Sequence, residues 1–343
     1  MMPVFMIGTQ RSGSNLLRLM INQIPEVAAP HPPHILQRMM PLVPLYGNLS
    51  DPRNFYQLID DVCRLVELNP VPWEGVTLNR NDVASRCWEQ NLVAIHAAVY
   101  DICAEAKGAK TWCCKSLANI NYAKEIEAYL KKPRYIYLYR DGRDVALSFR
   151  KAVVGEKHFY HIAKEWAGTQ EIAIKLRDTI PTGRFLNIRY EDLTNSPESV
   201  ARGICTFLDL EHCPIEAMLD YHETSEAKRA ATASGLWGNV TKAVMKDNTR
   251  KFMRQASEQD IRIFESVAGY VLDALGYDRV FVKKGEEIKF TEAEIAAFDA
   301  ENKRLKEEML KTVDPADRER RDRQEKLIKE IKSRPSRVVP ASR

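Results

Sequence analysis

The stretch that decides the fold reads Val4-Phe5-Met6-Ile7-Gly8-Thr9-Gln10-Arg11-Ser12-Gly13-Ser14-Asn15-Leu16-Leu17. Its apolar start predicts a short strand, its Gly- and Ser-rich middle predicts a turn, and its end predicts an amphipathic helix over about 14–23. A strand, turn and helix in this order present backbone N–H groups and a helix N-terminus to an anion. The stretch therefore predicts a loop that holds a phosphate-like group.

One departure from a familiar pattern narrows the ligand. Gly8 and Gly13 keep the glycine spacing of the ATP- and GTP-binding P-loop, Gly-x-x-x-x-Gly-Lys-Ser/Thr. Ser14 stands where that motif has its Lys, and a different cation, Arg11, lies inside the loop. We therefore expect a phosphate-like ligand other than the β/γ end of ATP.

Composition limits the classes of partner. A chain of 343 residues with 45% hydrophobic residues can form one large α/β domain or two ordinary ones. The formal net charge of +4 is compatible with an anionic ligand and too small to argue for nucleic acid.

Cysteine usage and the distribution of apolar residues indicate a compartment. Seven cysteines without a CxxC pair predict reduced thiols in the core. The first strand begins near Pro3, which leaves no room for a cleavable signal, and no apolar run approaches the ~18 residues of a membrane span. These observations predict a cytoplasmic protein without a transmembrane segment.

Strands alternate with helices along most of the chain. Strands are predicted over 4–7, 111–114, 135–139 and 185–188, and helices over 54–68, 82–106, 145–149, 161–177 and 197–208. The proline-rich stretch 25–44 is predicted to be loop or extended chain. The alternation predicts an α/β protein of the P-loop type, a three-layer fold with a central parallel sheet flanked by helices, plus a C-terminal helical tail.

The tail, 285–333, is rich in charge and has two interpretations. Apolar residues and one Asn repeat at alternating spacings of three and four: Ile295, Phe298, Asn302, Leu305 and Met309. This pattern could form a short coiled coil, and hence a homodimer, with a register-setting Asn. Because it spans only about two heptads, a tail helix that packs on its own domain is the preferred interpretation. Residues 334–343 are predicted to be disordered.

Four cations follow the predicted strands. Arg11, Lys115, Arg140 and Arg189 stand at or just after apparent C-terminal strand ends. In an open parallel sheet these ends line one crevice, where ligands bind. The set predicts a pocket for a strongly anionic ligand.

Two sequence blocks match a known family. The Gly8–Leu17 block and the block Tyr-Leu-Tyr-Arg-Asp-Gly-Arg-Asp-Val-Ala-Leu-Ser over 137–148 resemble the two cofactor motifs of sulfotransferases that use 3′-phosphoadenosine-5′-phosphosulfate (PAPS). The block 189–193, Arg-Tyr-Glu-Asp-Leu, is similar to a third family block, and 239–251 is more loosely similar to a late segment that covers the cofactor. Tyrosylprotein-type and bacterial sulfotransferases are the most similar in style. The resemblance implies a domain over 1–284, with 25–108 as an acceptor-side helical insertion.

The resemblance also implies roles for individual residues. Arg11 and Lys115 would stabilise the negative charge that grows on the bridging oxygen of PAPS during metal-free transfer of its sulfuryl group. The product would be PAP, which is PAPS without that sulfuryl group. Arg140 and Ser148 would bind the 3′-phosphate. The full set expected to bind the cofactor is Arg11, Ser12, Gly13, Ser14, Asn15, Arg140, Ser148, Tyr190, Asn239, Lys242 and Lys251.

The acceptor side is predicted to begin where the first helix ends. Related enzymes place a Glu or His shortly after the first helix, where this chain offers His31, with His34 in reserve, as the general base. Alternatively both histidines fill a surface loop, and a metal pair is disfavoured because Pro32 and Pro33 intervene. The acceptor would be a hydroxyl of a small molecule or peptide. Alternative functions are a P-loop kinase or NTPase, or a PAP-binding scaffold without catalysis.

Overall fold

A five-stranded parallel sheet forms the centre of the molecule. The computed structural model describes residues 2–335, apart from the side chains of residues 236 and 321. The strands are β1 (Val4–Gly8), β2 (Val27–Ala28), β3 (Thr111–Cys114), β4 (Arg134–Tyr139) and β5 (Phe185–Arg189), in the order β2-β3-β1-β4-β5. In register, Phe5 of β1 lies opposite Cys114 on one side and Tyr135 on the other. The predicted parallel α/β fold is confirmed.

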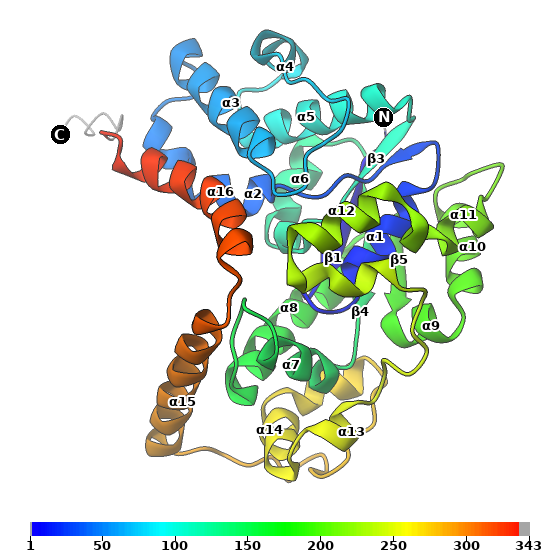
Figure 1. Ribbon diagram of the computed structural model, residues 1–343, viewed down its shortest axis with the longest axis vertical. Coiled ribbons are helices and arrows are strands. Elements are labelled where there is room, and N and C mark those ends of the chain that lie inside the picture. The colour runs from blue at the N-terminus through cyan, green and yellow to red at the C-terminus, as the bar shows by residue number, and fades with distance from the viewer. Residues whose placement is uncertain (1, 336–343) are drawn as a thin grey trace.

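Helices surround the sheet on both faces (Figure 1). They are, in chain order, α1 (Ser14–Asn22), α2 (Ile35–Met39), the 3₁₀ helix η1 (Met40–Tyr46), α3 (Pro52–Glu67), α4 (Arg80–Arg86), α5 (Leu92–Lys107), η2 (Leu117–Tyr122), α6 (Ala123–Tyr129), α7 (Gly142–Arg150), α8 (Phe159–Thr179), η3 (Thr182–Arg184), α9 (Tyr190–Asn195), α10 (Pro197–Phe207), α11 (Ile215–Leu219), η4 (Tyr221–Glu223), α12 (Ser225–Ala233), η5 (Gly235–Thr241), α13 (Phe252–Gln255), α14 (Glu258–Ala274), α15 (Glu292–Lys311) and α16 (Pro315–Ser333). No helix between residues 2 and 335 combines the length and apolar character needed to cross a bilayer.

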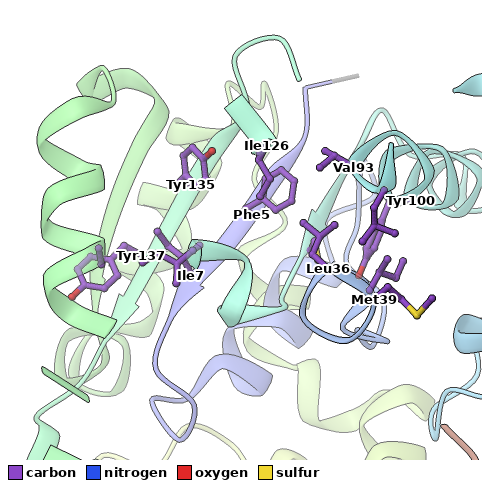
Figure 2. Packing of buried hydrophobic residues seen from close by; sticks show 14 of the residues in the cluster. Phe5, Ile7, Leu36, Met39, Val93, Tyr100, Ile126, Tyr135 and Tyr137 are labelled. Carbon is purple, nitrogen blue, oxygen red and sulfur yellow. The ribbon is translucent and has the colours of Figure 1, made fainter. Parts of the chain in front are cut away.

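Alternation along the strands divides the core between the two faces. Phe5 and Ile7 of β1, with Tyr135 of β4, belong to one cluster with residues of α2, α3, α5, α8 and α14. Figure 2 shows them beside residues of α2, α5 and α6. Val4 and Met6 point the other way and pack with α1, α10, α11 and α12. Because successive strand side chains face opposite ways, these apolar runs bury both faces of the sheet.

Two predicted segments are corrected by the structure. The stretch 25–44 is not wholly extended, because it contains α2 and η1; Pro41 occupies the first turn of η1, where a missing N–H costs nothing. The long helix predicted over 82–106 is two helices. Cys87 ends α4 in extended backbone, and Asn91 caps α5 through its side chain to the Ala94 N–H.

The tail forms α15 and α16, both packed on the rest of the chain. Phe298 of α15 stacks on His158, with ring centroids 4.5 Å apart. The buried Asn302 side-chain oxygen accepts hydrogen bonds from the backbone N–H groups of Lys157 and His158, at 2.8 and 3.0 Å. This part of the predicted coiled-coil seam is thus used within one chain. Of the segment predicted to be disordered, 336–343 lie outside the described residues.

The cysteines differ from expectation at one place. Cys205 and Cys213 form a disulfide between α10 and the chain just before α11, whereas the sequence predicted reduced thiols throughout. The other five cysteines are free thiols. Because disulfides persist mainly in oxidising compartments, a cytoplasmic location stays a prediction.

Candidate active site

The loop after β1 has left-handed backbone at three positions. The φ angles are 136° at Gly8, 69° at Arg11 and 88° at Gly13. A Cβ at Gly8 would lie 2.1 Å from the Leu138 carbonyl oxygen, and one at Gly13 would lie 2.5 Å from the Tyr190 ring. Both glycines are therefore required by their backbone and by their neighbours.

The N-terminus of α1 is open to an anion. Gly13 precedes α1 and offers no side chain to cap it, so the N–H groups of the first turn are left for another acceptor. Ser14 and Asn15, the first residues of this turn, line a cavity of about 570 Å³. The backbone N–H groups of the loop and the positive end of the α1 dipole are thus both directed into that cavity.

Two cavities meet at the loop. The larger cavity, of about 570 Å³, extends over α7 and η5, and the smaller cavity, of about 480 Å³, extends toward α2 and η2. Arg11, Ser14, Asn15 and Trp237 line both of them. A group held by the loop is therefore accessible from two sides.

Arg140 is fixed at the end of β4 beside the larger cavity. Its Nη1 donates to the Arg11 carbonyl oxygen at 3.1 Å, and its Nη2 donates to the Asn248 carbonyl oxygen at 2.6 Å. The guanidinium lies 4.3 Å from the centre of the Tyr190 ring, and an Asp144 carboxylate oxygen is 3.7 Å from Nη2. Burial raises the pKa of Asp144. These contacts orient Arg140, while its buried Nε has no hydrogen-bond partner between residues 2 and 335.

Arg11 connects the loop to α7. Its Nε donates to Ser148 Oγ at 3.0 Å. Burial, together with the Arg140 charge, lowers the pKa of Arg11. Two cations are thus held close together on the wall of the larger cavity, an arrangement that favours a multiply charged anion.

The remaining residues expected to bind the cofactor are mostly near the larger cavity. Tyr190, Asn239 and Lys251 line it, whereas Ser12 is fully buried within the loop and is not among the lining residues. Lys242 is exposed and is not among the residues that line it. Its carbonyl oxygen instead accepts a hydrogen bond from Tyr221 Oη at 2.6 Å.

Arg189 does not join the other strand-end cations. Its guanidinium lies 4.2 Å from the centre of the Tyr277 ring, and its Nε is 3.4 Å from a Glu191 carboxylate oxygen. It lines neither of the two cavities that meet at the loop. The pocket predicted from four strand ends is therefore built from Arg11, Lys115 and Arg140.

His31, His34 and Lys115 line the smaller cavity. Asn69 Nδ2 donates to the carbonyl oxygens of His31 and Val71, at 2.8 and 3.1 Å, so its Oδ1 faces His31 Nδ1 at 3.3 Å as an acceptor. This arrangement places the imidazole proton on Nδ1 and the lone pair on Nε2. The alternative interpretation, in which both histidines fill a surface loop, does not fit His31, which is only 6% exposed.

Burial sets the protonation of this wall. It lowers the pKa of His31 well below 6.5, with further lowering by the Arg18 and Lys115 charges, and lowers that of His34 to about 3. Burial and the Arg18 and Arg11 charges lower the pKa of Lys115 to about 7. Both histidines are therefore neutral at pH 7, while Lys115 is close to its midpoint.

Several cavity residues were not predicted from the sequence. Trp237 lies at the border, with its ring 4.5 Å from the His31 ring. Gln324, Glu325 and Ile328 of α16 line the smaller cavity, although the sequence showed α16 only as part of a charged tail. Between residues 2 and 335, no cluster of three or more His, Cys, Asp or Glu side chains could hold a metal ion.

This geometry agrees with comparisons to known proteins. A sequence model described as the sulfotransferase family matches residues 3–214, which include the loop, Lys115, Arg140 and Ser148. The chain belongs to the sulfotransferase family. Protein-tyrosine sulfotransferase A of Caenorhabditis elegans is 24% identical over 282 residues, covering 80% of this chain and 67% of that protein.

Solved structures of sulfotransferase domains share the fold. The sulfotransferase domain of the Synechococcus PCC 7002 olefin synthase has a TM-score of 0.56 and 20% identity, over 80% of this chain and 95% of that domain. The sulfotransferase domain from the curacin biosynthetic pathway has a TM-score of 0.50 and 17% identity, over 81% of this chain and 98% of that domain. These likenesses support the family assignment at the level of fold.

Proposed function

We propose that this sulfotransferase moves a sulfuryl group from PAPS to a hydroxyl acceptor by in-line transfer, without needing a metal. The nucleotide would occupy the larger cavity and the acceptor the smaller one. The observation that carries the proposal is the position of Arg11, which lines both cavities and is hydrogen-bonded to Ser148. A transferring group between the two substrates would lie next to this cation.

The larger cavity suits the phosphates of PAPS. The α1 N-terminus and the Ser12–Asn15 loop offer N–H donors to the 5′-phosphosulfate. Arg140 and Ser148 offer a guanidinium and a hydroxyl to the 3′-phosphate. Arg140 Nε is buried without a partner in the part of the chain described, as expected for a donor that a ligand satisfies. Tyr190, Asn239 and Lys251 would complete the site, and Lys242 would contribute from its rim.

The transfer exchanges one bond to sulfur for another. The bond between sulfur and the bridging oxygen breaks, its electron pair stays on the 5′-phosphate of PAP, and a bond forms from sulfur to the acceptor oxygen. Arg11 and protonated Lys115 stabilise the charge that develops on the bridging oxygen. The acceptor proton passes to a general base.

His31 is the proposed base. Its neutral state at pH 7 and the lone pair on Nε2 equip it to take the proton. Its place in the wall shared with Lys115 puts it on the acceptor side of the loop. His34 lines the same wall and is the reserve candidate.

One assay tests the proposed function. The full-length protein is incubated with ³⁵S-labelled PAPS and a panel of phenols, alcohols, sugars, lipids and tyrosine peptides, and PAP binding is measured by calorimetry. We expect PAP to bind and label to move to a hydroxyl acceptor. Tight PAP binding without transfer to any acceptor would favour the scaffold, and ATP turnover with Mg²⁺ without PAP binding would favour a P-loop kinase or NTPase.

A further inference from the structure

The smaller cavity has one wall that comes from the far end of the chain. Gln324, Glu325 and Ile328 of α16 line it together with residues of the loop and of the His31 segment. In Figure 1, α16 runs from the end of α15 toward α2 and α3. Residues 315–333 lie outside the 3–214 match to the family.

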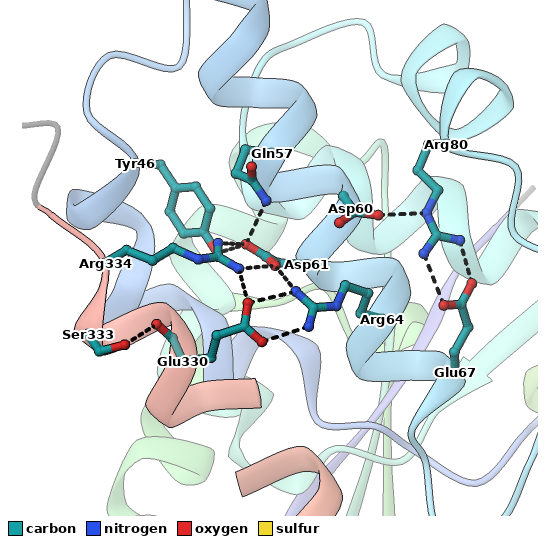
Figure 3. A network of polar contacts seen from close by, with 10 residues as sticks. All are labelled: Tyr46, Gln57, Asp60, Asp61, Arg64, Glu67, Arg80, Glu330, Ser333 and Arg334. Atoms are coloured by element: carbon teal, nitrogen blue, oxygen red, sulfur yellow. Dashed lines mark hydrogen bonds and ion pairs between the residues drawn. The ribbon is translucent and has the colours of Figure 1, made fainter. Parts of the chain in front are cut away.

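The C-terminal end of α16 is fixed by a network around Asp61 of α3 (Figure 3). Asp61 is fully buried and accepts hydrogen bonds from Tyr46 Oη at 2.8 Å, from Arg64 at 3.2 Å and from Arg334 at 2.9 Å. Glu330 binds both Arg64 and Arg334, each at 2.7 Å. Removing one cation from such a buried carboxylate is costly, which makes this network a strong attachment.

The rest of α16 is attached along its length. Near its start, Arg320 Nε donates to the Ala233 carbonyl oxygen at 2.9 Å. In the middle, Gln324 Nε2 donates to the Leu65 carbonyl oxygen at 2.8 Å, and Glu325 pairs with Arg38 at 2.7 Å. Leu327 is buried in the main core cluster. The helix is therefore a firm wall and not a loose extension.

We infer that α16 determines acceptor specificity by confining the smaller cavity to small-molecule hydroxyl acceptors. The inference rests on the proposed function, which assigns the acceptor to this cavity. A volume of about 480 Å³ is within the range of small-ligand pockets, roughly 300–1,000 Å³. An extended peptide is larger than this volume, and the attached α16 forms one of the walls that limit the cavity.

Two variants and one matched control test this inference in the full-length protein. Ile328→Ala enlarges the cavity at its wall, and Arg334→Ala loosens the attachment without touching the cavity. Lys329→Ala changes an exposed residue of the same helix and serves as the control. Because Asp317 of α16 lines the larger cavity, PAP affinity is measured by calorimetry in all four proteins. We expect it to be equal, because none of the three substituted residues lines that cavity and Asp317 lies at the opposite end of α16 from Arg334.

The first readout is acceptor preference. The ratio of kcat/KM for a tyrosine-containing decapeptide to that for 4-nitrophenol should rise about tenfold or more in Ile328→Ala and Arg334→Ala, a size typical of pocket discrimination. The control should match the wild type. An unchanged ratio in both variants, with PAP affinity intact, would overturn the inference.

The second readout needs neither PAPS nor an acceptor, so it separates this inference from the proposed function. Diethyl pyrocarbonate modifies accessible histidines, and peptide mass spectrometry follows His34 against the core residue His96. We expect faster modification of His34 in Arg334→Ala than in the wild type or in Lys329→Ala, with His96 unchanged. Equal rates of His34 modification in all three proteins would refute the inference that α16 closes this wall of the cavity. If His34 is modified faster in Arg334→Ala but the protein binds no PAP, the inference about α16 stands and the proposed function is refuted.

Discussion

Arg11 Nε and Ser148 Oγ share a hydrogen bond of 3.0 Å across 137 positions of the chain. It joins the loop after β1 to the helix after β4, two neighbouring strands of the sheet. Arg140 adds a second connection by donating to the Arg11 carbonyl oxygen. The cation proposed to act on the transferring group is therefore oriented by the residues proposed to bind the 3′-phosphate.

Replacing Arg11 with Ala should lower kcat about 10²–10³-fold, the size found when one oriented donor to a developing charge is removed. The rate is measured at saturating PAPS, so that weaker donor binding does not contribute. Arg202→Ala removes an arginine that is 65% exposed on α10 and serves as the control. A near-normal kcat in Arg11→Ala would refute its catalytic role.

Arg140→Ala should weaken PAP binding roughly tenfold to a hundredfold, because a charge-assisted hydrogen bond contributes about 1.5–3 kcal/mol. Isothermal calorimetry measures the affinity. Arg189→Ala is a matched control, since Arg189 also stands at a strand end but lies over Tyr277, away from both cavities. Equal losses in the two variants would show that general basic charge, and not a defined site, binds PAP.

His31→Ala should lower kcat about 10²–10⁴-fold, as expected for loss of a general base, while PAP affinity stays unchanged. His34→Ala is the comparison because His34 lines the same cavity. Single-turnover rates separate the chemical step from product release. If only His34→Ala slows the chemical step, the base is His34.

The pH profile should report Lys115. Its pKa in the free protein is lowered to about 7 by burial and nearby cations, so the ammonium is present below pH 7 and is lost as pH rises through that value. Since kcat/KM reports ionisations of the free enzyme, it should fall with rising pH around 7. The lowered pKa of His31 keeps its base form through this range.

Lys115→Arg tests the origin of that pH dependence. A guanidinium stays protonated at every pH used, so kcat/KM of the variant should lose its alkaline decline. A decline at the same pH in both proteins would assign the ionisation to another group. Lys115→Met should lower the rate below pH 7 and flatten the profile.

Four of the five strands and the cationic pocket followed from local sequence, whereas β2 and the cavity walls did not. Apolar strand runs and the glycines of the loop fix β1 and its turn, and the C-terminal ends of parallel strands meet at one edge. That rule placed Arg11 and Arg140 together, but it also included Arg189, because position on a strand does not reveal a competing partner such as Glu191.

The tail shows why long-range packing was harder to predict. The periodicity of 295–309 indicated an amphipathic helix, and the same pattern serves a coiled coil or a core contact equally well. Asn302 distinguishes them through hydrogen bonds to the backbone of 157–158, which are visible only when distant segments are placed side by side. Likewise, no sequence pattern around Gln324 or Ile328 indicates that these residues line a cavity.

The border shared by the two cavities determines which substitutions alter one cavity and which alter both. A substitution at Arg11, Ser14, Asn15 or Trp237 alters both cavities at once, since each of these residues lines both. Gln324 and Ile328 face only the smaller one. Gln324 and Ile328 are therefore positions at which the smaller cavity can change independently of the larger one, whereas Asp317 of the same helix lines the larger cavity.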